Sequence, residues 1–350
     1  MVILKYYSLI KPMYKNRYIF TQLMDYISRY QFDKCVKKYN WNNRVRNFNC
    51  WEQFLAMSFW QITYRESLRD VIICLKSQKE KLYHLGFSKE VFLPTLAKAN
   101  ENRNWKIYEE LAMILVEKAR KLHFWNIDVF PEILEDIYAL DSSTIDLCLN
   151  IFKWANFREN KGAIKLHTLL DLRWNIPTYI HISNWKLHDV NVLDLMKIEL
   201  WAFYIMDRWY FDFERLFKIN IDWWFFIIRL KINTKWNRIY SNKYEKNTGV
   251  KCDQIIKLSS KKWLKFYPEK VRRIKYYDKE NNKYYEFITN NFTISAKTVA
   301  DLYKSRWQVE LFFKWVKQHL KIKKFWWTSL NAVKTQIWIS ICTYLLVIIV

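Results

Sequence analysis

The sequence IYALDSSTIDL, at residues 137–147, is the clearest indication of the fold class. They are rich in β-forming residues, and two similar runs follow, AIKLHTLLDL at 163–172 and IPTYIHIS at 176–183. The polar break Arg173-Trp174-Asn175 between the last two runs is short enough for a hairpin turn. These three runs predict three strands in a meander.

The residues after this meander alternate between two patterns. The segments HDVNVLDLMKIEL (188–200) and FDFERLFKIN (211–220) have the spacing of helices. The segments WAFYIMD (201–207) and WFFIIRL (224–230) have the composition of buried strands. Because helices alternate with strands after a meander, the predicted fold class is α/β, with helices packed on a mixed sheet.

The segments around this core differ in composition. Residues 14–130 repeat apolar side chains at three- and four-residue spacing, which predicts a basic helical domain. Residues 234–298 are polar and rich in Lys and Tyr, and they predict a β-rich insertion. The segment AKTVADLYKSRWQVELFFKWVKQHLKI (296–322) predicts one long helix. The expected domains are 1–130, 131–233, 234–298 and 299–350.

The chain is strongly basic, with 58 Lys and Arg against 34 Asp and Glu and a net charge of +24. A hydrophobic fraction of 51% excludes a disordered chain. The charge favours a polyanionic partner, either nucleic acid or an anionic membrane surface, and a Lys-rich proteome without a binding role is the alternative. The six cysteines form no C-x-x-C pair, which argues against a zinc or redox site and favours reducing cytosol.

The last fourteen residues, 337–350, are apolar. A membrane-spanning helix needs about 20 apolar residues, so this segment predicts a buried helix, with a truncated membrane segment as the alternative.

Acidic side chains stand at unusual places in the predicted strands. Asp141 lies inside an apolar run, where an unpaired charge costs several kcal/mol, and Asp207 ends the run 201–207. At about 100° per residue, the helix 296–322 aligns four polar side chains beside its apolar stripe: Tyr303, Arg306, Glu310 and Lys317. Turn residues and surface salt bridges are the alternatives. In a basic chain, two such Asp and one Glu favour a carboxylate cluster that binds a divalent metal against phosphates.

The spacing of the four helix residues is specific. They follow the pattern Tyr, two residues, Arg, three residues, Glu, six residues, Lys. With this pattern the chain resembles, from about Tyr14 onward, the DDE transposases of the insertion-sequence-4 family. The resemblance implies a ribonuclease-H-like mixed sheet with flanking helices, a β-rich insertion and an all-helical N-terminal domain. It makes 1–130 the DNA-binding domain, 131–233 the first part of the catalytic core, and 299–350 the C-terminal helices of that core, truncated at the end.

The resemblance also implies the catalytic residues. Asp141, Asp207 and Glu310 match the family's metal-binding carboxylates, with Asp207 opening the stretch Asp207-Arg208-Trp209-Tyr210. The expected cofactor is Mg²⁺, as two ions that Mn²⁺ can replace. Asp146 and Asp171 also lie near strand ends, but neither falls at a family position, so both are expected to be structural.

The remaining helix residues are expected to bind DNA. Arg306 and Lys317 would hold backbone phosphates, Arg306 as a fork and Lys317 as a point charge. Tyr303 would stack on or hydrogen-bond to a nucleotide, with core packing as its alternative. His188 is expected to begin a helix, and His167 is expected to be structural.

The expected function is cut-and-paste transposition, in which metal-dependent cleavage at element ends is followed by strand transfer. The expected partners are double-stranded DNA, as terminal inverted repeats and target, and a second copy of the chain in a homodimer, with no membrane. The expected location is the bacterial cytoplasm, at the nucleoid. A decayed transposase that only binds DNA and a cellular nuclease of the ribonuclease-H type are the alternatives.

Glycine is rare, with 3 residues, whereas there are 19 tryptophans. Several tryptophans stand where the resembling family has glycine: Trp41, Trp60, Trp174, Trp185, Trp201, Trp209 and Trp327. The contexts of Trp41, Trp174 and Trp185 are turns that ask for a positive φ. Opal codons that the source reads as Gly are one hypothesis for these positions, and substitutions in a decayed element are the other.

Overall fold

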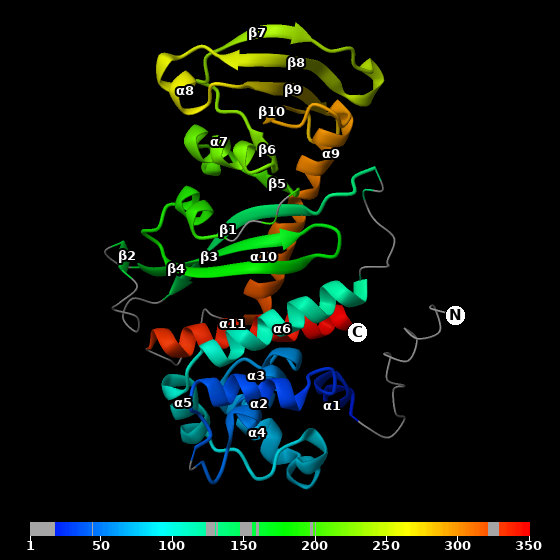
Figure 1. Cartoon of the computed structure of the whole chain (residues 1–350). Helices are drawn as coiled ribbons and strands as arrows, with labels where there is room; N and C mark the ends of the chain where they lie inside the picture. Colours follow the sequence, from blue (N-terminus) through cyan, green and yellow to red (C-terminus); the bar gives the residue numbers. More distant parts are fainter. Residues whose placement is uncertain are drawn as a thin grey trace. The chain divides into compact units, whose positions relative to one another are not determined.

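The structure, a computed structural model, describes residues 18–43, 45–123, 130, 132–147, 156–158, 161–196, 199, 201–320 and 329–350. The chain divides into two compact units. The helical unit comprises Met1–Phe124, Asn150–Trp154 and Val316–Val350, and the sheet unit comprises Trp125–Leu149 and Ala155–Trp315. Figure 1 shows the elements of both units.

The helical unit begins with short amphipathic helices. Their bounds are α1 (Ile19–Met24), α2 (Arg29–Lys38), α3 (Cys50–Ile62), α4 (Leu68–Ser77), α5 (Leu93–Asn102) and α6 (Lys106–His123). A capping box begins α3, in which Asn49 accepts from the Glu52 amide at 3.0 Å and Glu52 accepts from the Asn49 amide at 2.8 Å. Ser67 caps α4 by accepting from the amide of Asp70 at 3.2 Å.

Helix α11 (Leu330–Ile349) completes the helical unit. Its length and composition would allow it to cross a membrane, but 78% of its apolar window is buried, and it contacts α3, α5 and α6. The prediction of a buried helix near the end of the chain is therefore confirmed. The division of the chain differs from the expected one, because residues 316–350 group with the N-terminal helices. A helix that is apolar on all sides is most stable when other helices surround it.

The sheet unit contains the predicted meander and the predicted mixed sheet. Strands β1 (Ile137–Leu147), β3 (Lys161–Asp171) and β4 (Ile176–Asn184) pair antiparallel. Strands β5 (Phe203–Met206) and β6 (Phe225–Arg229) continue the sheet parallel to β1. The order β4-β3-β1-β5-β6 is that of a ribonuclease-H-like core, and the short β2 (Asn156–Arg158) pairs with β3.

The insertion lengthens this sheet instead of forming a separate one. Its strands are β7 (Trp236–Ser241), β8 (Val250–Leu258), β9 (Lys270–Asp278) and β10 (Lys283–Thr289). Strand β10 pairs antiparallel with β6, so the described strands form one sheet in the order β2-β3-β1-β5-β6-β10-β9-β8-β7, with β4 also on β3. The insertion is thereby held rigidly beside the core strands.

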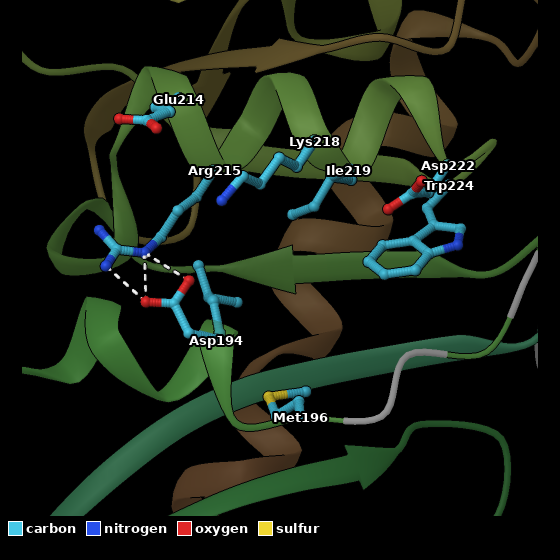
Figure 2. A pocket seen from close by; sticks show the side chains of 9 residues that line it. Asp194, Met196, Glu214, Arg215, Lys218, Ile219, Asp222 and Trp224 are labelled. Atoms are coloured by element: carbon cyan, nitrogen blue, oxygen red, sulfur yellow. Dashed lines mark hydrogen bonds and ion pairs between the residues drawn. The ribbon is translucent and has the colours of Figure 1, made fainter.

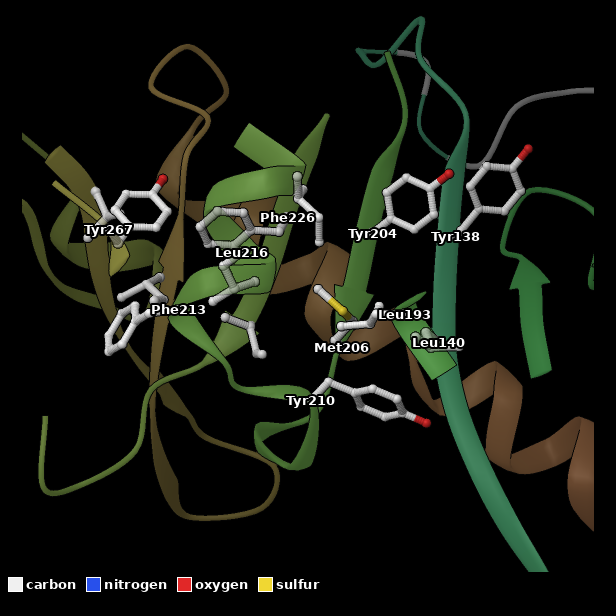
Figure 3. Packing of buried hydrophobic residues seen from close by; sticks show 14 of the residues in the cluster. Tyr138, Leu140, Leu193, Tyr204, Met206, Tyr210, Phe213, Leu216, Phe226 and Tyr267 are labelled. Carbon is white, nitrogen blue, oxygen red and sulfur yellow. The ribbon is translucent and has the colours of Figure 1, made fainter. Parts of the chain in front are cut away.

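One face of the sheet packs on the 3₁₀ helix η6 (Asp189–Asp194), α7 (Phe213–Ile221) and α8 (Lys261–Phe266). Figure 3 shows the core there, which includes Tyr138, Leu140, Tyr204, Met206, Phe213 and Phe226. A full helix was predicted over 188–200, but the described part of this segment forms only η6.

The other face carries α9 (Ala296–Ser305) and α10 (Trp307–Leu320). The prediction of a single helix was wrong at one point, because the two helices meet at Arg306. The amide of Arg306 bonds to the carbonyl of Tyr303 at 3.3 Å, and the amide of Val309 bonds to the carbonyl of Arg306 at 3.0 Å. These bonds span three residues, which tightens the chain into a turn at this point.

The tryptophans that stand where the resembling family has glycine differ in their backbone conformation. Near Trp41 and Trp174 the left-handed residues are Asn40, Asn42 and Asn175, so the tryptophans themselves need no glycine backbone. Trp185 also has no positive φ, so a positive φ occurs in two of the three expected turns, but not at the tryptophans themselves. Asparagine supplies the turn conformation at two of them.

The other tryptophans of this group differ among themselves. Trp60 is buried in α3 and donates to the carbonyl of Arg65 at 2.6 Å. Trp209 is exposed beside Arg208, so its ring points away from the protein interior next to Asp207. Trp201 has a φ of 61°, and its neighbour Trp223, which the sequence did not single out, has a φ of 63°. Trp327 lies outside the described residues.

Replacing Trp201 by Gly is expected to raise the free energy of unfolding by about 1 kcal/mol, because a left-handed backbone costs an L-residue about 1–2 kcal/mol. The ring is 54% exposed and lies tilted against Trp223, with centroids 5.6 Å apart, so its loss removes little burial. Urea midpoints measure the change. Trp201→Ala is the control, because it loses the ring and keeps the strain; an alanine variant more stable than the glycine variant would contradict this account.

Candidate active site

Three charged residues form one row across the parallel strands of the sheet unit. The last paired positions are Leu140 with Met206 and Met206 with Ile228, all on the face that packs in the core of Figure 3. The residues that follow them, and so belong to the opposite face, are Asp141, Asp207 and Arg229. The row places two of the predicted carboxylates at the face that α9 and α10 cover.

Arg306 connects this row to α10. Its Nη1 donates to Oδ2 of Asp141 at 2.5 Å, and its Nη2 donates to Oε1 of Glu310 at 2.8 Å. The side chain is only 14% exposed. Its position at the junction of α9 and α10 aims the guanidinium at the strand carboxylate. Arg306 was expected to hold phosphates, but here both arms of its fork are bonded to carboxylates.

Tyr303 orients the second carboxylate of the row. Its hydroxyl donates to Oδ1 of Asp207 at 3.1 Å, and its ring packs on Phe287 with centroids 4.5 Å apart. Burial and the charge of Asp207 raise the pKa of Tyr303, so the phenol stays protonated and keeps donating. The ring is thus packed into the protein, as in the core-packing alternative, and its hydroxyl supports a site carboxylate.

The carboxylates influence one another electrostatically. Burial raises the pKa of Asp141 to about 6, with Glu310 and Asp207 adding to the shift and Arg306 opposing it. Burial works against the charge on Arg306, but Asp141, Tyr303, Asp207 and Glu310 together raise its pKa. One guanidinium therefore does not fully offset the cost of ionising Asp141, and a further positive charge would help to keep that carboxylate ionised.

The residues fit a divalent cation by type and by charge. Carboxylate oxygens are the ligands that Mg²⁺ prefers, and three acidic groups surround a single guanidinium. Among the residues that the structure describes, no group of three His, Cys, Asp or Glu side chains is arranged to hold a metal ion. Since Arg306 stands between Asp141 and Glu310, binding a metal there requires Arg306 to release at least one of them.

A cleft of about 800 Å³ opens beside these groups within the sheet unit. Its lining includes Asp207, Glu310 and Arg306 at the site, and Arg229, Tyr285 and Lys283 from β6 and β10. The insertion therefore supplies one wall of the space next to the carboxylates. The space is large enough to admit part of an extended polymer.

The other predicted residues lie in varied places. Lys317 is exposed in the last turn of α10 and groups with the helical unit. Asp171 is buried and accepts from the amide of Arg173 at 3.0 Å, which fits a structural role in a turn. His188 precedes η6 as predicted. His167 is buried, with Nε2 2.9 Å from Oγ of Ser183. The side chain of Asp146 lies outside the described residues.

Sequence reasoning missed two features of the site. The first is Arg229, which ends a buried strand as Asp207 does and could have been found by the same signal. The second is a support behind Asp141: Ser142 donates its amide to Asp141 at 2.8 Å and its hydroxyl to Asp189 at 2.7 Å. Lys165 also donates to Asp189, at 3.2 Å. The segment that carries Asp189 is distant in sequence, so no local pattern indicated this contact.

A second pocket, of about 500 Å³, lies on the α7 side of the sheet unit (Figure 2). Arg215, which lines it, donates to Asp194 at 2.6 to 3.1 Å and also pairs with Asp212. None of the acidic residues at the cleft lines this pocket. Its arrangement fits a structural ion pair.

Comparison with known families gives two matches. The family described as "Transposase DDE domain" matches residues 133–346, and one described as "Domain of unknown function (DUF4372)" matches residues 15–88. The first covers more than half of the chain and includes every predicted carboxylate.

Similar proteins carry corresponding names. A protein of Geobacillus stearothermophilus named as a transposase for insertion sequence element IS5377 is 27% identical over 72% of this chain and 65% of its own length. A transposase of Sinorhizobium fredii is 29% identical over 59% of this chain and 58% of its own length. This chain thus spans less than two thirds of both relatives. A transposase for element IS4SA of Synechocystis is 24% identical over 90% of this chain and 87% of its own length.

A solved structure was also found, the piggyBac transposase synaptic complex with hairpin DNA. It matches with a TM-score of 0.47 and 10% identity, over 96% of this chain and 76% of its own.

Proposed function

Because the chain belongs to the family of transposases with a DDE domain, we propose that it cuts DNA at the ends of a mobile element and joins those ends to target DNA. The observation that carries the proposal is the convergence of Asp141 and Glu310 on Arg306, with Asp207 lining the same cleft. Membership of the insertion-sequence-4 group in particular rests on the spacing of the four helix residues.

Asp141, Asp207 and Glu310 would hold the divalent metal, with Mg²⁺ as the expected ion. When bound, such ions activate the attacking oxygen and stabilise the leaving one. Tyr303 keeps Asp207 in one orientation through its hydroxyl. Arg306 keeps Asp141 and Glu310 together before metal binds, and its charge remains beside the strand afterwards. Exposed Lys317 would contact a phosphate.

Recognition of element ends would belong to the helical unit. Helix α4 follows α3 after a short turn, and the turn and helix together expose three basic residues, Arg65, Arg69 and Lys76. The buried face of the same helix is apolar, with Leu68, Val71, Ile72 and Leu75. A basic exposed face on a helix anchored by its apolar face suits contact with DNA phosphates and bases. We further infer a cytoplasmic protein that acts as a homodimer on DNA.

The test uses the full chain and duplex DNA taken from both sides of its gene. We expect binding that prefers the element ends over random DNA, and nicking at those ends with Mg²⁺ or Mn²⁺ but not with a chelator. Cleavage of random DNA at the same rate would favour a cellular nuclease. Specific binding without any cleavage would favour a decayed transposase.

Charge removal on α4 tests the recognition role. Deleting residues 1–130 would uncover α11, so point variants are the cleaner choice. The double variant Arg69→Gln and Lys76→Gln is expected to weaken binding at element ends and to reduce the salt slope by about 0.9 for each phosphate that the helix no longer neutralises. Lys121→Gln, at an exposed site on α6, is the control. An unchanged slope in the α4 variant would exclude α4 from the interface.

A further inference from the structure

Arg229 lies one strand away from the site carboxylate Asp207. The parallel register of β5 and β6 aligns the two residues, and neighbouring strands lie about 4.8 Å apart. Successive phosphates of a DNA strand rise about 3.4 Å along the helix axis and lie farther apart through space, a separation that the strand spacing and the long Arg side chain together can cover. A phosphate adjacent to the one at the carboxylates therefore lies within reach of the Arg229 side chain.

The insertion supports Arg229 from the side. Arg229 pairs with Phe287 across β6 and β10, which puts Tyr285 on the same face two residues along. The guanidinium lies over the Tyr285 ring at 5.1 Å from its centroid. The Tyr285 ring in turn stacks near Phe287, with centroids 6.1 Å apart. This contact holds the guanidinium in place and leaves its N–H groups free to bind.

The charges along the cleft distinguish Arg229 from Lys304 and Arg306, and its partial burial distinguishes it from the exposed Lys283. Lys304 bonds to Glu280 at 2.5 Å, and Arg306 bonds to two carboxylates. Within the part of the chain that the structure describes, Arg229 has no carboxylate at ion-pair distance, although it lines the cleft and is only partly exposed. A half-buried guanidinium without an acidic partner suits an anionic ligand, and a planar fork suits phosphate.

We propose that Arg229, held by Tyr285, binds the DNA phosphate next to the one that the carboxylates process. This inference rests on the proposed function and adds to it a strand-binding site supplied jointly by β6 and the insertion. Arg229 is a substrate-binding residue, and Tyr285 is a positioning residue that acts through it.

The test measures binding of the full chain to a short fluorescent duplex with one recessed 3′ end, over a range of salt and without metal. Arg229→Gln is expected to weaken binding about tenfold and to reduce the salt slope by about the value of one phosphate contact. Arg229→Lys should keep the slope and lose part of the affinity. Tyr285→Phe should behave as wild type, whereas Tyr285→Leu should resemble Arg229→Gln.

Neutralising single phosphates of the DNA shows which phosphate Arg229 contacts. A methylphosphonate next to the scissile phosphate should weaken binding of the wild type and leave binding of Arg229→Gln unchanged. Arg238→Gln removes the same charge from exposed β7 and is the control, with urea midpoints to check that all variants fold.

The outcomes separate this inference from the proposed function. A salt slope unchanged by Arg229→Gln, in a protein whose metal-dependent cleavage is intact, would overturn the role of Arg229 alone. A slope that depends on Arg229, in a protein that never cleaves, would overturn the proposed cleavage and leave the phosphate site standing.

Discussion

Asp141→Asn is expected to lower the rate of DNA cleavage by a factor of about 10³ or more, equivalent to about 4 kcal/mol of activation free energy. The carboxylate lies in one row with Asp207 and Arg229, which line the cleft, and an amide at this place cannot bind a divalent metal as a carboxylate does. DNA affinity should persist, because the variant removes a negative charge near phosphates. Asp207→Asn and Glu310→Gln should behave alike.

The substitution should also leave the fold intact. Burial already raises the pKa of Asp141 to about 6, so the site tolerates a neutral isostere. Glu117→Gln is the control, since Glu117 is exposed and pairs with Lys121 on its own helix, α6. Gel assays of strand cleavage and urea midpoints give the two readouts. Cleavage retained in Asp141→Asn would remove Asp141 from the site, and loss of DNA binding would point to a structural role.

Arg306→Ala is expected to destabilise the metal-free protein by about 3–5 kcal/mol, because it leaves two carboxylates without their guanidinium. Added Mg²⁺ should raise the melting temperature of this variant more than that of the wild type. In the wild type the cation has to displace Arg306 from a carboxylate, whereas in the variant nothing occupies that place.

The comparison of melting with and without Mg²⁺ needs a control for ion-pair loss in general. Arg215→Ala serves, because Arg215 pairs with Asp194 on the α7 side of the sheet, away from the cleft (Figure 2). Its melting temperature should fall without any added response to Mg²⁺. An equal Mg²⁺ response in the wild type and both variants would contradict metal binding between Asp141 and Glu310.

The predicted strands were confirmed. They could be predicted because strand-forming composition is a local property of the sequence. The run 137–147 became β1 with those same bounds, and Asp141 inside it bonds to Arg306, which lines the cleft. The helix pattern over 296–322 was also local, but the break at Arg306 was not visible in it. The break falls at Arg306, whose side chain bonds to Asp141, a residue far away in sequence.

The features that escaped prediction depend on strand pairing. Arg229 ends a buried run as Asp207 does, but its alignment with Asp207 and its contact with Tyr285 depend on the register of β5 with β6 and on the pairing of β6 with β10. No spacing along the chain indicates either pairing.

The left-handed backbone of Trp223 follows from the end of α7, where the amide of Trp224 bonds to the carbonyl of Ile219 at 3.1 Å and the amide of Trp223 bonds to the carbonyl of Asn220 at 3.3 Å. This is the motif that usually ends a helix with Gly, so it is a local signal, as is the resemblance that marked Trp201.

The placement of α11 sets an order of events during synthesis. Because α11 fills the interior of the helical unit and follows the whole sheet unit in the chain, the ribosome makes the N-terminal helices long before the helix that they enclose. The sheet unit can fold as it emerges from the ribosome. During that time the apolar faces of the earlier helices are not yet covered by α11. A protein whose translation stops early would carry complete strands but an open helical unit. The proposed recognition of DNA would therefore be completed last, after the site for cleavage has already been assembled.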